Sequence, residues 1–345
     1  MPSVQERALP PEMRAKDRPE VLSTGLTTIE KGAVDAAHSI FHEHWWLDIA
    51  TAGEWRLATV RRNQTVIAEM PYYVARMGLW RISQLPPLTR TLGPVIRSTG
   101  FGDAREAHHR RDLTAQLIEQ LPHCDSFFQV FDPRVEDALA FALNGFTVSA
   151  RYTFRIPGHC SVADAWAKLD SKTRNVIRGA DKQLMIAPIA TPAEFLAFYE
   201  SNLATRSRTN AYGTVLMRQL VNAFVEREAG HLLGAYGPNG RLVAAIGVVW
   251  DQHAMHYLLS TRAHDAHGGS ISLLLWTAIQ RSLERKLTFD FDGFSSPSTF
   301  NFLKGFGGTL TQRLGVERLS TTYSVARILK RRVAPKSGIV FAPHL

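Results

Sequence analysis

The chain has 345 residues, of which 45% are hydrophobic and 21% are charged, and its formal net charge is +9. This composition describes a globular protein that is long enough for two domains with proper cores. It excludes a disulfide framework or a cysteine metal site, since the only cysteines are Cys124 and Cys160, and a transmembrane helix, since the longest markedly apolar run, residues 242–250, is too short to span a bilayer.

The two ends of the chain differ in character. Residues 1–20 mix basic residues with prolines and acidic residues and lack the apolar core of a signal peptide, which predicts a disordered tail over residues 1–25 and a cytoplasmic location. Residues 324–345 contain five basic residues and no acidic one. We predict a basic C-terminal tail there. It either contacts anionic lipids at the inner membrane face, nucleic acid or phosphorylated substrates, or it is simply solvated.

The first half of the chain alternates between helix and strand patterns. The sequence predicts, in order, a helix at 33–50, strands at 55–60, 65–73 and 76–85, a proline- and glycine-rich loop at 86–94, a helix at 104–120, a strand at 127–131, a short helix near 141–146, and strands near 148–155.

The second half repeats this order with clearer signals. Ser161 and Thr191 each open a capping box, in which side-chain oxygens satisfy free amides at a helix start, so helices are expected after both. Asn239 and Gly240 lie between two apolar runs and indicate a hairpin, because both residues accept the left-handed conformation. Further elements are expected as a helix at 215–228, strands at 231–236, 241–250 and 253–260, a helix at 271–283, and a strand at 287–291.

An interval of 160 residues relates two similar segments, each an apolar strand ending in aspartate and a short helix closing on a Gly-Phe pair. Phe131, Asp132, Gly145 and Phe146 recur without a gap as Phe291, Asp292, Gly305 and Phe306. This pattern predicts a duplicated unit, with domains at residues 26–158 and 159–323. Only the second copy adds Gly293, Lys304, Gly307 and Gly308, which points to the second half as the working one.

Several short runs carry a resemblance to a known superfamily. They are Trp-Leu-Asp at 46–48, Met-Pro-Tyr-Tyr at 70–73, Pro-Leu-Thr at 87–89, Leu-Gly-Pro at 92–94, Ser-Lys-Thr-Arg at 171–174, Ile-Arg at 177–178, Phe-Asp-Phe-Asp-Gly at 289–293 and Phe-Leu-Lys-Gly-Phe-Gly at 302–307. With the element order, they resemble the GNAT acyltransferases, and within these the tandem-domain proteins similar to FemAB-type aminoacyl transferases and to BioF2-like or CelD-like acetyltransferases. The resemblance implies an α/β (α+β) fold of two tandem GNAT-like domains, each a mixed, mostly antiparallel sheet flanked by helices.

The resemblance also implies a reaction. An acetyl or other acyl group would pass directly from acyl-CoA to an amine acceptor, an amino sugar or a lipid-linked precursor of a cell-envelope polysaccharide, with no metal. In the alternative, aminoacyl-tRNA is the donor. Either reaction needs a site that holds two substrates, deprotonates an ammonium group and stabilises an oxyanion.

The loop before the helix at 271–283 lies where a GNAT protein holds the pyrophosphate of CoA. The cofactor-binding candidates in this loop are Arg262, His267, Gly268, Gly269 and Ser270. Small residues let backbone amides approach phosphates, and the positive end of the next helix favours an anion. The loop has histidine where the family pattern has its first glycine, so an ordinary turn with a serine cap is the alternative.

Asp292 and His256 are the candidates for the catalytic base. Asp292 ends a buried strand, where burial raises a carboxylate pKa, and histidine titrates near neutrality unaided. Each also has a structural alternative. Asp292 could cap the turn at Gly293, as Asp132 would in the first copy, and His256 could be a structural residue of its strand.

Basic residues supply the substrate-binding candidates. Periodicity predicts one helix from Val162 to Ala180, with Arg174 and Arg178 on its polar side. These arginines either hold phosphates of a nucleotide- or lipid-linked acceptor or form a solvated face. Lys304, beside the second Gly-Phe pair, and Arg206 are further candidates.

Three hypotheses therefore follow from the sequence. In the first, the second half binds acyl-CoA, the first half serves as scaffold, and the acceptor lies at the domain junction. The second replaces the donor with aminoacyl-tRNA. The third is a non-catalytic protein that docks at membranes through its basic tail. A monomer or a homodimer is expected.

Overall fold

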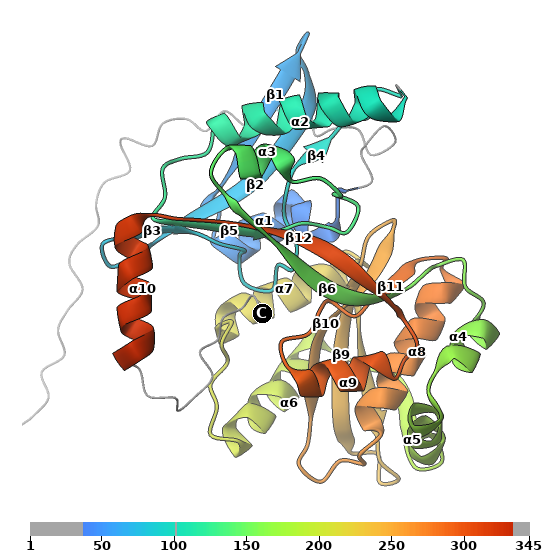
Figure 1. The fold of residues 1–345 in the computed structure, drawn as a ribbon. Helices are drawn as coiled ribbons and strands as arrows, with labels where there is room; N and C mark the ends of the chain where they lie inside the picture. Colours follow the sequence, from blue (N-terminus) through green and yellow to red (C-terminus); the bar gives the residue numbers. More distant parts are fainter. Residues whose placement is uncertain (1–36, 101, 334–345) are drawn as a thin grey trace, which may run out of the picture.

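The computed structural model describes residues 37–100 and 102–333. The helices are η1 (Ile40–His42), α1 (His44–Thr51), α2 (Asp103–Glu119), α3 (Leu139–Leu143), α4 (Val162–Lys168), α5 (Ser171–Asp181), α6 (Pro192–Thr205), α7 (Thr214–Glu226), α8 (Ser270–Glu284), α9 (Pro297–Lys304) and α10 (Thr321–Val333). The strands are β1 (Trp55–Arg62), β2 (Thr65–Met77), β3 (Trp80–Ser83), β4 (Val95–Ile96), β5 (Ser126–Val130), β6 (Thr147–Ile156), β7 (Met185–Pro188), β8 (Gly230–Tyr236), β9 (Leu242–Trp250), β10 (Ala254–Arg262), β11 (Thr288–Asp290) and β12 (Thr309–Leu319). Figure 1 shows their arrangement.

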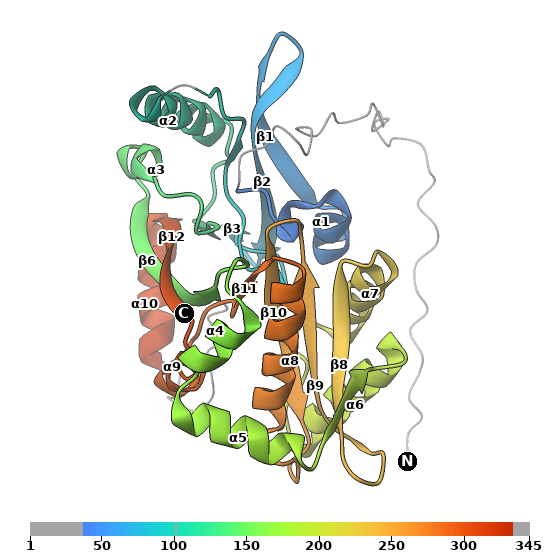
Figure 2. The ribbon, with the colours of Figure 1, turned by 90° about the vertical axis from the view of Figure 1, so that its right-hand side faces the viewer.

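All the described strands belong to one mixed, mostly antiparallel sheet, as the sequence predicts for the class of fold. Its order is β1-β2-β3-β5-β12-β6-β11-β10-β9-β8-β7, and β4 pairs with β2 at the side. Only the β3–β5 and β10–β11 pairs are parallel among the described strands. Helices flank the sheet on both faces (Figures 1 and 2).

The two halves of the chain exchange one strand each. β6 leaves the first half to pair with β11, and β12 leaves the second half to pair with β5. The two exchanged strands also pair with each other along nearly their whole length, as Figure 1 shows at the centre of the molecule. The predicted boundary at residue 158 therefore divides the chain but not the sheet.

The strand register repeats the 160-residue interval of the sequence. Gln129 pairs with Val316, and the equivalent positions Phe289 and Ile156 also pair with each other. Tyr152 faces Gln312, its own equivalent, so the approximate two-fold axis of the duplication passes through the middle of the β6–β12 ribbon.

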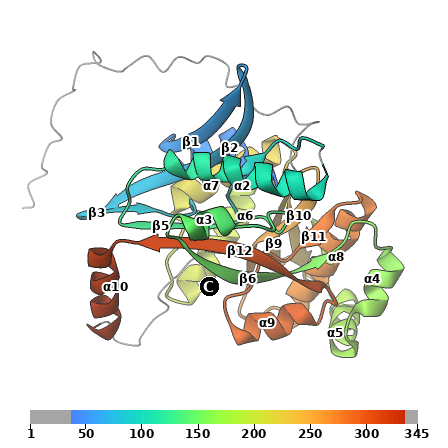
Figure 3. The same cartoon turned by 45° about the horizontal axis from the view of Figure 1, so that its top comes forward.

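Both faces of β9 are covered, which explains why this strand reads as a continuous apolar run. Ala244, Ile246 and Val248 pack in the core cluster that contains α8, whereas Ala245 and Val249 pack in the cluster that contains α6 and α7. That second cluster also includes η1 and α1, so it joins the start of the described chain to the second half. A third cluster includes buried residues of α2 and α3, two helices that lie side by side in Figure 3.

The helix predicted from Val162 to Ala180 is in fact two helices. The first ends at Lys168, and Asp170 caps the second, since its carboxylate accepts a hydrogen bond from the Thr173 amide at 2.5 Å. Its own amide donates to the Gly305 carbonyl oxygen at 3.0 Å, so the second Gly-Phe turn sits on the break. Sequence periodicity missed the break because the apolar spacing continues across it.

The two predicted tails fall largely outside the described residues. Residues 1–25 lie outside them entirely. The segment predicted as a basic tail from residue 324 begins inside helix α10, and its described apolar residues Val325, Ile328 and Leu329 are about half exposed. No helix of the described chain has the length and apolar character needed to cross a membrane.

Gly307 and Gly145 provide a matched test of how closely the second Gly-Phe turn is packed. Both have positive φ, of 71° and 78°. A Cβ at Gly307 would overlap the backbone carbonyl of Lys168, whereas one at Gly145 would meet nothing within 4 Å. We expect Gly307→Ala to lower the free energy of unfolding by about 2–5 kcal/mol and Gly145→Ala by about 1–2 kcal/mol. Urea unfolding followed by circular dichroism measures both, and equal losses would contradict the close packing.

Candidate active site

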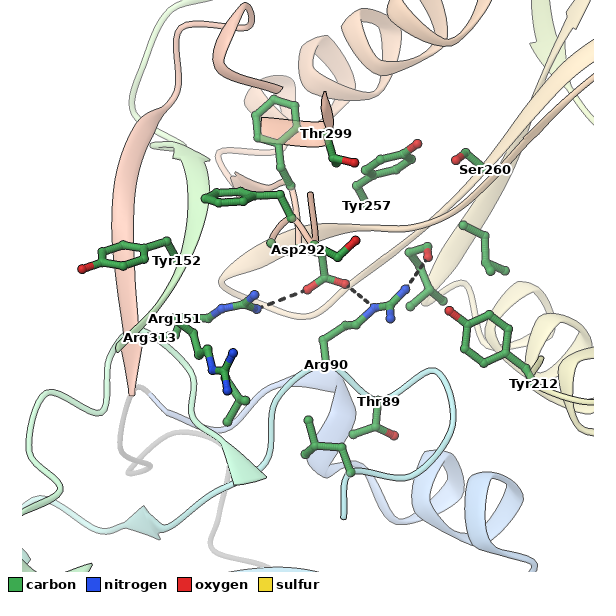
Figure 4. A pocket seen from close by; sticks show the side chains of 18 of the residues that line it. Thr89, Arg90, Arg151, Tyr152, Tyr212, Tyr257, Ser260, Asp292, Thr299 and Arg313 are labelled. Atoms are coloured by element: carbon green, nitrogen blue, oxygen red, sulfur yellow. Dashed lines mark hydrogen bonds and ion pairs between the residues drawn. The ribbon is translucent and has the colours of Figure 1, made fainter. Parts of the chain in front are cut away.

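A cavity of about 440 Å³ opens where the parallel strands β10 and β11 diverge. These strands pair only from Ala254 to His256, and β10 then continues to Arg262 without β11. The cavity is lined by Leu85, Thr89, Arg90, Val130, Ala150, Arg151, Tyr152, Tyr212, Tyr257, Leu258, Leu259, Ser260, Phe291, Asp292, Gly293, Phe294, Ser295, Thr299 and Arg313. Both halves of the chain therefore contribute to it (Figure 4).

Arg90 bridges the two halves at this cavity. Its Nε donates to Asp292 Oδ2 at 2.8 Å, and one terminal nitrogen donates to the Leu258 carbonyl oxygen at 2.8 Å (Figure 4). Leu258 lies at a bulge in the β9–β10 pairing, and bulges of this kind redirect backbone groups beside functional sites. Trp46 holds the Arg90 loop, because its indole nitrogen donates to Thr89 Oγ1 at 3.0 Å.

Asp292 occupies a strained and buried position. Its φ is +65°, and its side chain is only 3% exposed. Its amide donates to Asp290 Oδ1 at 2.8 Å, and the Gly293 amide donates to Thr153 Oγ1 on the exchanged strand β6 at 3.0 Å. Left-handed aspartate persists only where its surroundings fix it, as these bonds do here.

The charges around Asp292 oppose one another. Burial raises the pKa of the Asp292 carboxyl above its ordinary value and outweighs Arg90, His256 and Arg313, which lower it. Burial acts on the Asp290 pKa in the same direction, but Arg155 and Arg313 outweigh it and hold this pKa low. Of these two carboxyls, Asp292 is therefore the stronger base, and only Asp292 lines the cavity.

His256 and Asp292 lie together, as a shared catalytic role requires. His256 Nδ1 is 3.9 Å from Asp292 Oδ1, and its Nε2 is 3.8 Å from Asp251 Oδ2. Burial disfavours the charged ring, but Asp251, Asp292 and Asp290 outweigh this effect and raise the His256 pKa. His256 does not line the cavity and contacts Asp292 from the buried side.

The two copies of the duplicated aspartate have different partners. Asp132 is held by Arg134, two residues later, at 2.6 Å. Phe294 stands at the position equivalent to Arg134. Asp292 therefore has no arginine two residues later, and its carboxylate forms ion pairs with arginines from distant parts of the chain. Asp132 is thus paired within its own turn, whereas Asp292 is not, so the two aspartates do not have the same structural role.

The predicted donor loop lies apart from this cavity, at the start of α8. His267, Gly268 and Gly269 line a shallow hollow together with residues of α5. The Gly269 amide donates to His267 Nδ1 at 3.0 Å, and the Ser270 amide donates to the His267 carbonyl oxygen at 3.0 Å. A Cβ at Gly269 would lie 2.7 Å from the Val176 carbonyl oxygen, so α5 covers this turn closely. Arg262 is exposed at the end of β10.

The predicted substrate-binding residues also lie outside the cavity lining. Arg174 donates to the Ala167 carbonyl oxygen at 2.9 Å, and Arg178 lies over the Trp166 ring, 5.5 Å from its centroid. Both arginines thus fasten α5 to α4. Arg206 donates to the Arg262 carbonyl oxygen at 2.9 Å, and Lys304 is exposed at the end of α9.

Sequence reasoning missed the arginines of the cavity. Arg90 lies in a loop whose flanking runs carry the family resemblance, but no pattern distinguished it. Arg151 and Arg313 lie on the exchanged strands. At the interval of 160 residues, Arg151 corresponds to Thr311 and Arg313 to Thr153. This difference between the two copies could have identified both arginines from the sequence.

His256, Asp290 and Asp292 form the one cluster of possible metal-binding side chains among the described residues. Three arginines already compensate the two carboxylates: Arg90 and Arg313 lie at Asp292, and Arg155 Nε is 3.1 Å from Asp290 Oδ2. The donor set thus fits internal ion pairing better than a cation.

Comparisons with known proteins agree on the class of protein. The model of the acetyltransferase (GNAT) domain family matches residues 171–296, which is less than half of the chain. Among curated protein sequences, none matches the chain. The chain resembles the crystal structure of FemX with a TM-score of 0.63 and 11% identity, over 87% of this chain and 95% of that one.

Two further structures show the same fold. A conserved protein of unknown function from Bacteroides thetaiotaomicron has a TM-score of 0.51 and 12% identity, over 79% of this chain and 91% of that one. L-PGS from Bacillus licheniformis has a TM-score of 0.50 and 11% identity, over 83% and 90%. The protein therefore has a GNAT acyltransferase-type fold. Within this fold, residues 171–296 are the segment that resembles the acetyltransferase (GNAT) domain family.

The raised pKa of His256 predicts how this residue affects stability with pH. A histidine with a raised pKa contributes stability fully below its unfolded pKa, near 6.5, and loses it as pH rises through the folded pKa. We expect His256→Gln to cost about 1–3 kcal/mol at pH 6 and less as the pH rises. Urea unfolding from pH 5.5 to 9 measures the difference.

His253→Gln is the control for this experiment. Burial lowers the His253 pKa, so its contribution changes with pH in the opposite direction. A His256→Gln loss that does not change with pH would show that the ring is not charged in the folded protein.

Proposed function

We propose that the protein is an N-acyltransferase whose reaction takes place in the cavity between β10 and β11. The observation that carries this proposal is the position of Asp292, a buried carboxylate with a raised pKa at the point where the strands separate. The GNAT-type fold supports the same reaction class.

The geometry suits the chemistry of acyl transfer to an amine. Beyond His256, none of the described strands pairs with β10 on the β11 side, so an extended donor arm can lie along this edge and form hydrogen bonds with its backbone groups. Asp292 takes a proton from the acceptor ammonium. The amine nitrogen then attacks the donor carbonyl, the thiolate or ribose oxygen leaves with the bonding electrons, and this leaving group takes up the second proton that the nitrogen releases.

Acyl-CoA is the donor that we propose first, and the amine belongs to an amino sugar or a lipid-linked precursor. The acceptor rests on the sequence resemblance alone. We also propose that the protein is cytoplasmic and that its basic C-terminal segment contacts the inner membrane face.

Aminoacyl-tRNA is a second candidate donor, and the start of α8 favours it. The amides of Gly269 and Ser270 already bond within their own turn, and α5 covers Gly269. Fewer amides are left there for a pyrophosphate group. The net charge of +9 and the resemblance in fold to FemX also suit this donor.

A comparison of donors tests the proposal. With acetyl-CoA and a panel of amines, we expect CoA release that depends on the acceptor. With charged tRNA, we expect transfer that falls steeply with salt, because phosphate contacts are screened. Acyl transfer from either donor supports the function and selects between the two. Transfer from neither, with no thermal stabilisation by any acyl-CoA, would refute it.

Asp292→Asn tests the base, and Asp132→Asn serves as the matched control. Removing a general base costs about 10²–10⁴-fold in rate, so we expect kcat to fall by at least about 100-fold for Asp292→Asn. Asp132→Asn breaks the equivalent buried ion pair away from the cavity, so it should lower the melting temperature and leave kcat within about threefold. Equal kcat values for the two variants would assign Asp292 a structural role.

A further inference from the structure

Two arginines face each other across the exchanged strands that line the cavity. Arg151 of β6 and Arg313 of β12 occupy directly paired positions of the antiparallel ladder. Figure 4 shows their side chains next to each other beside Asp292. Like charges at directly opposed positions repel, so this pair costs stability unless an anion lies against it.

The cavity lining has too few negative charges to neutralise these two arginines. Asp292 is the one carboxylate among the residues that line the cavity, and it already contacts Arg90 and Arg313. Within the described chain, Arg151 has no ion pair and lies only over the Phe128 ring, 5.7 Å from its centroid. The lining therefore carries an excess of positive charge.

Both arginines also keep donors unused. The Nε atoms of Arg151 and Arg313 are buried and have no hydrogen-bond partner in the described structure. Arg313 is only 7% exposed. A buried donor without a partner costs free energy, so keeping these two arginines here lowers the stability of the fold.

The duplication shows that the fold itself does not need this pair. Under the 160-residue interval, Arg151 corresponds to Thr311 and Arg313 to Thr153, and these two threonines also face each other in the same ladder. At its symmetry-related position, the ribbon therefore carries an uncharged pair. The arginine pair therefore occurs at only one of the two equivalent positions, the one that lines the cavity.

We propose that Arg151 and Arg313 bind an anionic group of the acyl acceptor, a carboxylate or a phosphate. This inference rests on the proposed function and names its substrate class. Arg313 lies 3.6 Å from Asp292 Oδ1, so the anion site adjoins the carboxylate that receives the amine. The acceptor is therefore a zwitterion whose anionic group lies only a few bonds from its amine. Guanidinium groups bind carboxylates and phosphates through two parallel hydrogen bonds.

Paired acceptors test this inference. The pairs are glucosamine 1-phosphate with glucosamine and β-alanine with β-alaninamide, used with whichever donor supports transfer. We expect the anionic member of at least one pair to have a kcat/KM at least about tenfold higher. Arg151→Gln should remove the preference, chiefly by raising the KM of the anionic acceptor, and Arg151→Lys should restore part of it.

Arg318→Gln is the matched control. Like Arg151, Arg318 lies over a phenylalanine ring, that of Phe146, but it lies outside the cavity, on the strand β12 that carries Arg313. It should leave the preference unchanged. Equal use of neutral and anionic acceptors by the wild type, or a preference that persists in Arg151→Gln, would overturn the inference and leave the proposed function standing.

Binding separates the two proposals if no transfer occurs. Thermal stabilisation by glucosamine 1-phosphate or β-alanine that is lost in Arg151→Gln would support the anion site without any transferase activity. No stabilisation by either compound in an inactive protein would refute the anion site as well as the function.

Discussion

Each half of this molecule completes its part of the sheet with a strand that belongs to the other half. β6 pairs with β11, β12 pairs with β5, and the two exchanged strands pair with each other. This arrangement fixes the distance and the angle between the halves through backbone hydrogen bonds, which leave little freedom for a hinge. The cavity depends on it, because Arg151 and Thr153 reach the second half only on β6.

The site at this junction contains several buried charged side chains. Asp290 and Asp292 are nearly inaccessible, and their carboxylates meet Arg90, Arg155 and Arg313. Burying ions is expensive, and the attraction between them offsets that cost only when each charge has partners in good geometry. The three arginines come from a loop of the first half and from both exchanged strands. The buried carboxylates are therefore stabilised only when the two halves are correctly assembled.

Much of the architecture could be predicted from the sequence. The capping residues Ser161 and Thr191 begin helices as expected, and the Asn239–Gly240 turn lies between β8 and β9. The exchange of strands could not be predicted, because hydrophobic alternation identifies a strand but not its partner. The break at Asp170 was missed for a related reason, since the bond between its amide and the Gly305 carbonyl joins distant parts of the chain.

The candidate site was predicted only in part. Asp292 and His256 were found because aspartate at a strand end and a strand histidine are recognisable in isolation, and the structure brings them together. Arg90, Arg151 and Arg313 were not found, because their importance lies in what faces them. The basic residues that the sequence favoured, Arg174 and Arg178, are used to attach one helix to another.

The exchanged strands also constrain how the chain folds. β5 lies in the first half of the chain, but the strand that pairs with one of its edges, β12, is synthesised almost 200 residues later. During synthesis that edge stays open, and an unpaired strand edge is a template for association with other chains. Separated halves would each expose such an edge. Because these pairings join strands that are far apart in the sequence, we expect the two halves to fold together and slowly, and folding at low protein concentration to give the least association.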